Sequence, residues 1–203
     1  MALHRIAYML VLLAAATLSS AAAAPIPAIT PIGNAVSGGL GDFTVGWSFT
    51  VSQSIRVTDL GYLDRGQDGL VGSHSIGLWT GAGSLLASDT VTNADALDGR
   101  FRYTDIVDVV LSPGVYVVGG TNDSVDGFIV TGSFTTPPEI GFLRARYVAG
   151  AALAFPNGVA GIQTPQGGFF GGGFRFEAVP EPGTLALLGL GLAGLAATRR
   201  RKQ

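Results

Sequence analysis

The stretch of sequence that decides the fold is FTVGWSFTVS, residues 43–52. Large apolar side chains occupy every second position, and threonine, serine or glycine occupies the positions between them. A period of two places alternate side chains on opposite faces of an extended strand. The stretch therefore predicts a β-strand whose large apolar groups, Trp47 among them, all face a core.

Similar segments recur along the chain between turn signals. A phase shift near Asp59 indicates a bulge, and residues 81–84 (GAGS) are typical of a hairpin. Further strands are expected over residues 55–62, 73–80, 85–92, 101–111, 115–120, 128–130, 140–147 and 174–178. Many short strands with turns between them predict an all-β domain, an antiparallel β-sandwich of which a jelly roll is one form.

The composition excludes several classes of site. The chain has 31 glycines and no cysteine, so disulfides, thiolate metal sites and cysteine nucleophiles are excluded. Between the two apolar ends there are seven arginines, eleven aspartates and two glutamates, so the body is acidic. Phosphate recognition needs a basic face, and the acidic body therefore argues against a nucleic-acid partner.

The N-terminus has the three parts of a secretory signal peptide. A short polar start at residues 4–5 precedes an apolar run at 6–18 and a series of small residues at 19–24. A buried N-terminal helix is the alternative, but such a helix would be amphipathic, and this run is apolar on every side. We therefore expect export, with a signal peptide at residues 1–23. This segment is expected to form a helix that precedes the β-domain.

The C-terminus carries a second apolar segment. Residues 184–197 (TLALLGLGLAGLAA) contain no charge, and four basic residues follow at 199–202. A helix of this length rises about 21 Å against a hydrocarbon core of roughly 30 Å, so it would be a short, weak transmembrane anchor. Basic residues after an apolar span stay on the cytoplasmic side, which places the body outside. A weak anchor favours later release, and a permanent tail anchor is the alternative.

These C-terminal features together resemble the PEP-CTERM sorting signal of Gram-negative bacteria. The matching residues are the motif Pro180, Glu181 and Pro182, the helix residues Leu185, Leu187, Leu188, Leu190, Leu192 and Leu195, and the basic tail Arg199, Arg200, Arg201 and Lys202. The resemblance implies recognition by an exosortase, a membrane cysteine protease, at an inner-membrane intermediate, followed by release or transfer to the cell surface. Such proteins tend to occur where exopolysaccharide and biofilm are made.

Part of the body resembles a domain of unassigned function that is common in PEP-CTERM proteins. The phrases that carry this resemblance are GWSFTVSQSIRVTDLGYLD, DGLVGSHSIGLWTGAGSLLAS and FRYTDIVDVVLSPGVYVVGG. The resemblance supports an extracellular β-domain and transfers no catalytic residue. The expected order is therefore a signal peptide at 1–23, an N-terminal arm at 24–41, a β-sandwich domain at 42–179 and the sorting signal at 180–203.

Two pairs of aspartates lie in glycine-containing loops. Asp64 and Asp68 could offer hard oxygens to Ca²⁺, but their spacing is not that of an EF-hand loop. Aspartates also shape glycine turns through hydrogen bonds to the backbone, which is the favoured interpretation here. The same interpretation applies to Asp123 and Asp126.

His74 is the single histidine of the mature body. A catalytic triad would need a serine elbow of the G-x-S-x-G type, which the sequence lacks, and a multi-histidine zinc site cannot be built from one histidine. Its alternation with Ile76 and Leu78 predicts a half-buried structural residue. Asp105 and Asp108 lie three apart on a predicted strand, where regular alternation puts them on opposite faces, so they are a poor pair for glycoside hydrolysis.

Four aromatic residues are candidates for stacking against a sugar, namely Trp47, Trp79, Tyr62 and Tyr103. Trp47 lies on the apolar face of its strand and is expected in the core. Trp79 is out of phase with its apolar neighbours, so we expect it at the surface as the candidate sugar-stacking residue.

Taken together, the sequence predicts an exported, non-enzymatic surface or matrix protein that is structural or associated with exopolysaccharide. Its expected partners are signal peptidase, the secretion machinery, an exosortase and, transiently, the inner membrane. No cofactor, metal or catalytic residue is predicted. A carbohydrate- or calcium-binding module is one alternative, and an extracellular hydrolase that uses His74 is another.

Overall fold

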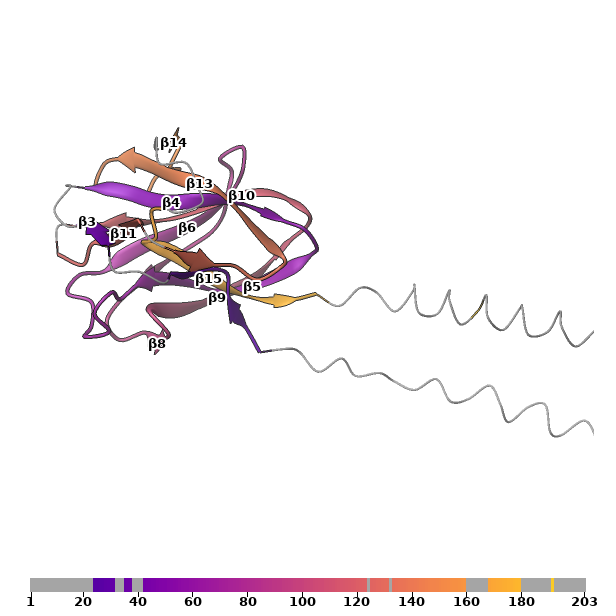
Figure 1. Ribbon diagram of the computed structural model, residues 1–203, viewed down its shortest axis with the longest axis horizontal. Helices are drawn as coiled ribbons and strands as arrows, with labels where there is room; N and C mark the ends of the chain where they lie inside the picture. Colours follow the sequence, from indigo (N-terminus) through magenta and orange to yellow (C-terminus); the bar gives the residue numbers. More distant parts are fainter. Residues whose placement is uncertain are drawn as a thin grey trace, which may run out of the picture.

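The computed structural model describes residues 24–31, 35–37, 42–123, 125–131, 133–159, 168–179 and 191 (Figure 1). The expected signal peptide lies outside these residues, as does the expected membrane helix except for residue 191. Among the residues that are described, no helix combines the length and the apolar character that crossing a bilayer requires.

The described chain consists of short strands, and all pairings among them are antiparallel. In chain order the strands are β1 (Ile26–Pro27), β2 (Thr30–Pro31), β3 (Ala35–Ser37), β4 (Phe43–Val51), β5 (Ile55–Leu63), β6 (His74–Thr80), β7 (Leu85–Val91), β8 (Ala96–Asp98), β9 (Phe101–Leu111), β10 (Gly114–Asn122), β11 (Phe128–Thr131), β12 (Phe134–Thr135), β13 (Ile140–Ala149), β14 (Gly158–Val159) and β15 (Gly172–Ala178). The antiparallel all-β class expected from the sequence is confirmed.

Two larger sheets enclose one core. The first has the order β1-β15-β5-β9-β8 and the second the order β14-β13-β4-β10-β6-β7, while β11 pairs with β3 and β12 with β2. The edge strand β7 of the second sheet runs close to β9 of the first, so the sheets curl toward each other along this side into a half-barrel.

Strand β4, predicted from the stretch at residues 43–52, lies in the middle of the second sheet between β13 and β10. The prediction that its large apolar groups face a core is confirmed for Val45, Trp47, Phe49 and Val51, which are buried, whereas Phe43 at its start is partly exposed. Trp47 stacks on Phe174 of the opposite sheet, with ring centroids 6.0 Å apart. The other face of β4 is also covered. There Thr44 is buried, and its hydroxyl accepts a hydrogen bond from the amide of Ala154.

Two local predictions within the strands are also confirmed. The pairing of β5 with β9 and with β15 shifts register around Val57 and Asp59, which is the expected bulge. The chain reverses between β6 and β7 through a turn in which the amide of Gly83 donates to the carbonyl of Thr80. Gly83 has a φ of 96°, a left-handed conformation that glycine adopts without steric cost.

The glycine-rich stretch at 167–173 is described from residue 168 onward, and it packs into the body. In its described part Phe170 is fully buried, and the chain enters β15 at Gly172. A Cβ atom at Gly172 would lie 2.7 Å from backbone atoms of both Gly119 and Gly120 in β10. Glycine is required here because the backbones of the two sheets touch.

The residues expected to form an N-terminal arm contribute to the body where they are described. Strand β1 pairs with β15 at the edge of the first sheet, and β2 pairs with β12. Between these two strands Ala28 and Ile29 are buried in the core. The segment is therefore part of the domain rather than an appendage to it.

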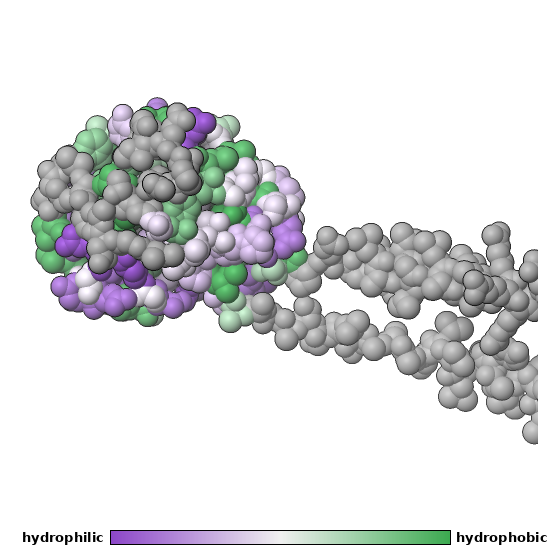
Figure 2. Space-filling model, in the orientation of Figure 1, coloured by the Kyte–Doolittle hydropathy of each residue, from purple (hydrophilic) through white to green (hydrophobic). Residues whose placement is uncertain are grey.

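The surface mixes apolar and hydrophilic residues, as Figure 2 shows for the face that it draws. Among the residues that the structure describes, the most exposed large apolar side chains are Val107, with 91% of its surface accessible, and Val71, with 78%. Val107 lies where β9 bulges away from β5, and Val71 lies in the loop before β6. Both positions are places where the chain leaves regular strand pairing.

Candidate metal centre

His74 is the first residue of β6, and its side chain points into the molecule. It shares a buried face with Ile76 and Leu78, as the alternation predicts, but it is fully rather than half buried, with 1% of its surface accessible. The ring of Tyr62 lies parallel to the imidazole, with centroids 3.7 Å apart. The orientation of the histidine ring is therefore set by packing.

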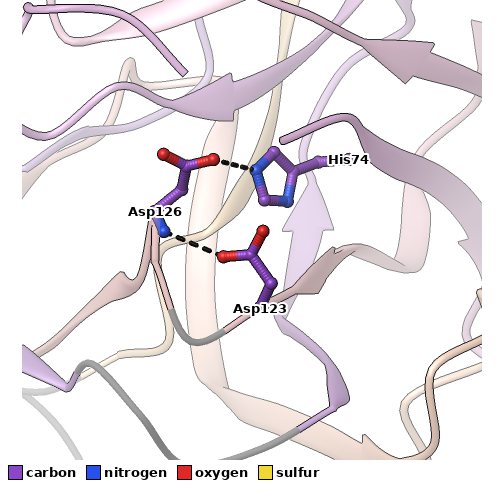
Figure 3. A group of neighbouring side chains, drawn as sticks. All are labelled: His74, Asp123 and Asp126. Atoms are coloured by element: carbon purple, nitrogen blue, oxygen red, sulfur yellow. Dashed lines mark hydrogen bonds and ion pairs between the residues drawn. The ribbon is translucent and has the colours of Figure 1, made fainter. Parts of the chain in front are cut away.

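Both ring nitrogens of His74 have oxygen neighbours. Nδ1 lies 2.7 Å from the carbonyl oxygen of Thr121 in β10, and Nε2 lies 2.9 Å from Oδ2 of Asp126. Figure 3 shows Asp126 and Asp123 converging on the same region as the imidazole. These contacts connect the start of β6 to the end of β10 and to the turn that follows it.

The turn between β10 and β11 positions the two carboxylates through backbone hydrogen bonds. Asp123 Oδ1 accepts hydrogen bonds from the amides of Val125 and Asp126, each at 2.8 Å. The carboxylate of Asp126 accepts hydrogen bonds from the amides of Val71 and Gly72 in the loop before β6. The prediction that these aspartates shape a turn is consistent with these bonds, which also join two loops.

The environment shifts the pKa values of two groups. Burial by itself raises the pKa of Asp126, but the amides of Val71 and Gly72 and the contact with His74 favour the carboxylate, so that its pKa lies below the ordinary value. The pKa of Tyr62 is raised, first by burial and then by the nearby carboxylates of Asp123 and Asp126. Asp126 is therefore an anion, and Tyr62 keeps its proton.

His74, Asp123 and Asp126 each offer one ligand atom, and these atoms all lie within 4.8 Å of one another. An imidazole and two carboxylates at this spacing can chelate a cation. Sequence reasoning missed the group, since 52 positions separate His74 from Asp126 in the chain. The spacing of Asp123 and Asp126 was the only local signal of it.

Of the predicted turn-shaping pair Asp64 and Asp68, Asp64 is the one whose carboxylate binds the turn. Asp64 is buried, and its Oδ2 accepts hydrogen bonds from Nε of Arg102 at 2.9 Å and from the amide of Gly69 at 3.1 Å. Asp64, Asp68 and Asp126 line a polar pocket of about 300 Å³ between the two loops. The structure thus supports the structural role of Asp64 and places both residues near the candidate metal centre.

The prediction that Trp79 is exposed is wrong. The side chain has 4% of its surface accessible and packs edge-on against Phe155, with ring centroids 6.0 Å apart. The chain around Phe155 covers the outer face of β6, so this face is not open to solvent. Tyr62 and Tyr103 are buried as well, and Trp47 is in the core as predicted, so none of the four aromatic residues presents a ring to a sugar.

Asp105 and Asp108 do not follow simple alternation. Asp59 pairs with Asp105 and Val57 with Val109, so β9 has two more residues than β5 over this interval. Both aspartates are exposed and border the same hollow between β7 and β9. The expectation that they face opposite sides depended on regular pairing, which the bulge interrupts.

The predicted sorting residues, from Pro180 to Lys202, lie outside the described residues. The body ends immediately before them: Ala178 is the last residue of β15, and the amide of Val179 donates to the carbonyl of Ser54. Strand β1 pairs with β15, with Ile26 opposite Phe176. The two ends of the described body therefore leave it side by side.

Comparison with known proteins identifies the C-terminus and not the body. No curated protein and no solved structure matches the chain. Residues 178–202 match the model of the PEP-CTERM protein-sorting motif. The match begins at Ala178, the last residue of β15. The motif implies an exported protein that an exosortase processes and sorts to the cell surface. The chain therefore carries a PEP-CTERM protein-sorting motif at its C-terminus.

Proposed function

We propose that the chain is a non-enzymatic structural protein of the cell surface or extracellular matrix, associated with exopolysaccharide. The observation that carries the proposal is the sorting motif at residues 178–202, which follows the β-domain without a linker. An exosortase substrate is delivered to the outside, where its body has to act. The body is an acidic all-β domain with a continuous core, which suits a structural component.

The arrangement of the two ends supports delivery in a membrane-bound form. Because β1 pairs with β15, the residues that follow the signal peptide lie beside those that precede the motif. Both apolar ends would then attach to the same side of the domain. In this orientation the rest of the domain points away from the membrane while the motif is processed.

The geometry of His74 supports a non-enzymatic role. A general base needs a free nitrogen within reach of a nucleophile or substrate. Both ring nitrogens of His74 contact oxygen atoms, from Thr121 and Asp126, and the ring is buried beneath Tyr62. The described serines donate no hydrogen bond to this ring, so a hydrolase based on His74 has no support from the contacts.

The sorting step can be tested in a host with an exosortase and in an isogenic host without it. We expect the surface form to lack the apolar segment at 185–203 only where the enzyme is present, as intact-mass measurement will show. Glu181→Ala and the combined change of Arg199–Arg201 to alanine should block processing. Glu177→Ala, in β15 just before the motif, is the matched control and should be processed normally. A surface form that retains the segment in both hosts would show that sorting does not involve cleavage.

The association with exopolysaccharide has its own test. We expect the processed chain to sediment with the polysaccharide fraction and to be freed when that polymer is degraded or its synthesis is blocked. A chain that stays soluble in the presence of the polymer would contradict the association, while leaving the sorting unaffected.

The second candidate function is a carbohydrate- or calcium-binding module. The cluster of His74, Asp123 and Asp126 favours a cation site in this candidate, although its imidazole nitrogen is not a ligand that Ca²⁺ prefers. Burial of Trp79 removes the residue from which sugar stacking was expected. Glycan-array binding with and without a chelator tests both parts, and an absence of signal in both formats would eliminate the carbohydrate part.

A further inference from the structure

The His74 ring lies between two hydrogen-bond acceptors. The carbonyl oxygen of Thr121 is 2.7 Å from Nδ1, and a carbonyl can only accept, so Nδ1 carries the hydrogen. In the neutral ring Nε2 then has a bare lone pair, 2.9 Å from the carboxylate oxygen Oδ2 of Asp126. Two lone pairs that face each other at this distance need a positive charge between them, which is either a proton on Nε2 or a metal ion.

Asp123 adds a second negative charge to the group. Its ligand oxygen lies within 4.8 Å of those of His74 and Asp126. In the described part of the chain, no arginine forms an ion pair with either aspartate. A proton on His74 would balance only one carboxylate, whereas a divalent cation would balance both. The Asp126 side chain has 6% of its surface accessible, and Asp123 is half-buried, so the two charges are only partly screened by solvent.

The surroundings leave space next to the carboxylates. A Cβ atom at Gly72 would lie 2.7 Å from Oδ2 of Asp123 and would press on it, whereas its 3.5 Å from Oδ2 of Asp126 is an ordinary contact. Glycine therefore keeps the space beside the Asp123 carboxylate open. The polar pocket of about 300 Å³ that Asp126 lines, together with Val125, provides a route from solvent to the carboxylate. An ion could therefore reach the group without opening the core.

The ligand types indicate the class of ion. Ca²⁺ and Mg²⁺ prefer oxygen ligands, whereas an imidazole nitrogen suits first-row transition metals such as Zn²⁺. Zinc bonds of about 2.0–2.2 Å at tetrahedral angles place neighbouring ligand atoms about 3.4 Å apart. Nε2 and Oδ2 are 2.9 Å apart, so binding of the ion would move them slightly away from each other. Metal-bound histidines also donate their other N–H to a backbone carbonyl or carboxylate, and Thr121 accepts in this way.

We propose that Nε2 of His74 and the carboxylates of Asp123 and Asp126 bind a divalent transition-metal ion, with solvent completing its coordination. The ion joins the start of β6 to the turn between β10 and β11. The site lies in the body and is independent of the sorting motif, so failure of one proposal leaves the other standing.

The test uses the full chain, exported without a histidine tag, stripped with a chelator and then dialysed against ZnCl₂. Elemental mass spectrometry measures bound zinc, and tryptophan fluorescence follows thermal unfolding, because Trp47 and Trp79 are both buried. We expect about one zinc per chain and a Tm that is higher with zinc than with chelator, as mass action requires for a ligand of the folded state. CaCl₂ at the same concentration should produce no comparable shift.

Three variants make the assignment specific. Asp123→Asn keeps an oxygen for the turn amides and removes the charge, and His74→Gln removes the nitrogen ligand. Changing a residue that only supports a metal ligand already lowers metal affinity by about 10–100-fold. Because these two variants change the ligands themselves, we expect zinc affinity to fall by at least that factor in each. Asp68→Asn removes a carboxylate that lines the same pocket outside the group and should bind zinc as the wild type does.

Three results would overturn the proposal. The first is a wild-type chain that retains no zinc after dialysis. The second is zinc binding that survives in both Asp123→Asn and His74→Gln. The third is a Tm that responds to pH in the same way with and without metal, because the cation between His74 and Asp126 would then be a proton.

Discussion

Replacement of Gly172 by alanine tests the close contact between the two sheets. The new Cβ would lie 2.7 Å from backbone atoms of Gly119 and Gly120, a distance that real Cβ atoms essentially never show. Backbone atoms cannot rotate away as a flexible side chain can, so β15 and β10 would have to separate. This separation would also strain the hydrogen bond from Nε1 of Trp47 to the carbonyl of Gly172, now 3.1 Å long.

The expected cost is the sum of two effects. Overpacking a tight core costs about 1–3 kcal/mol, and weakening a buried hydrogen bond costs about 1 kcal/mol. Gly172→Ala should therefore lower the free energy of unfolding by roughly 2–4 kcal/mol. The matched control is Gly114→Ala in β10, where the nearest atom to the new Cβ is 3.5 Å away. Because alanine restricts the unfolded chain, this control should be neutral or stabilising by up to about 1 kcal/mol.

Urea denaturation of the exported chain, followed by tryptophan fluorescence, measures both changes. We expect a lower midpoint for Gly172→Ala and an unchanged or higher midpoint for Gly114→Ala, with equal slopes. If the two variants unfold at the same urea concentration, the backbones of the two sheets do not touch at Gly172, and the close packing of β15 on β10 is refuted.

Three further substitutions test other parts of the structure. The folded-state pKa of Asp126 lies below its ordinary value of 3.8. The contacts of its carboxylate therefore stabilise the fold above that pH, and this stabilisation is lost as the pH falls through the folded pKa. Asp126→Asn should make the decline of Tm in acid shallower, and an unchanged acid profile would contradict this. Arg102→Ala leaves Asp64 buried without its cation, which should cost about 3 kcal/mol in urea denaturation, with partial recovery in Arg102→Lys; a neutral alanine variant would show that the pair contributes nothing. Trp79→Ala should destabilise the domain by about 3–5 kcal/mol and leave any glycan-array signal unchanged, whereas loss of signal in a folded variant would restore a role in sugar binding.

Local patterns in the sequence predicted the strands well. Period-two alternation located β4, and the phase shift near Asp59 located the bulge in β5. The glycine turn after Thr80 predicted the hairpin. These signals could be read because each depends on residues within about ten positions of one another, where the geometry of an extended chain sets which side chains share a face. The sorting motif could be recognised because its three parts follow one another directly in the sequence, within residues 178–202.

The candidate metal centre and the burial of Trp79 depend on contacts between distant residues. His74 meets Asp126 across 52 positions because β6 pairs with β10 and the next turn folds back over the ring. Trp79 is buried because the chain near Phe155 covers the outer face of its strand. Alternation states which residues share a face but not what covers that face, since strand order and the paths of connecting segments are properties of the folded chain.

By itself, then, the sequence determined the class of fold, the strand positions and the route of export. The tertiary structure alone decided which side chains of separate strands meet, because such contacts require sheets that local patterns do not specify.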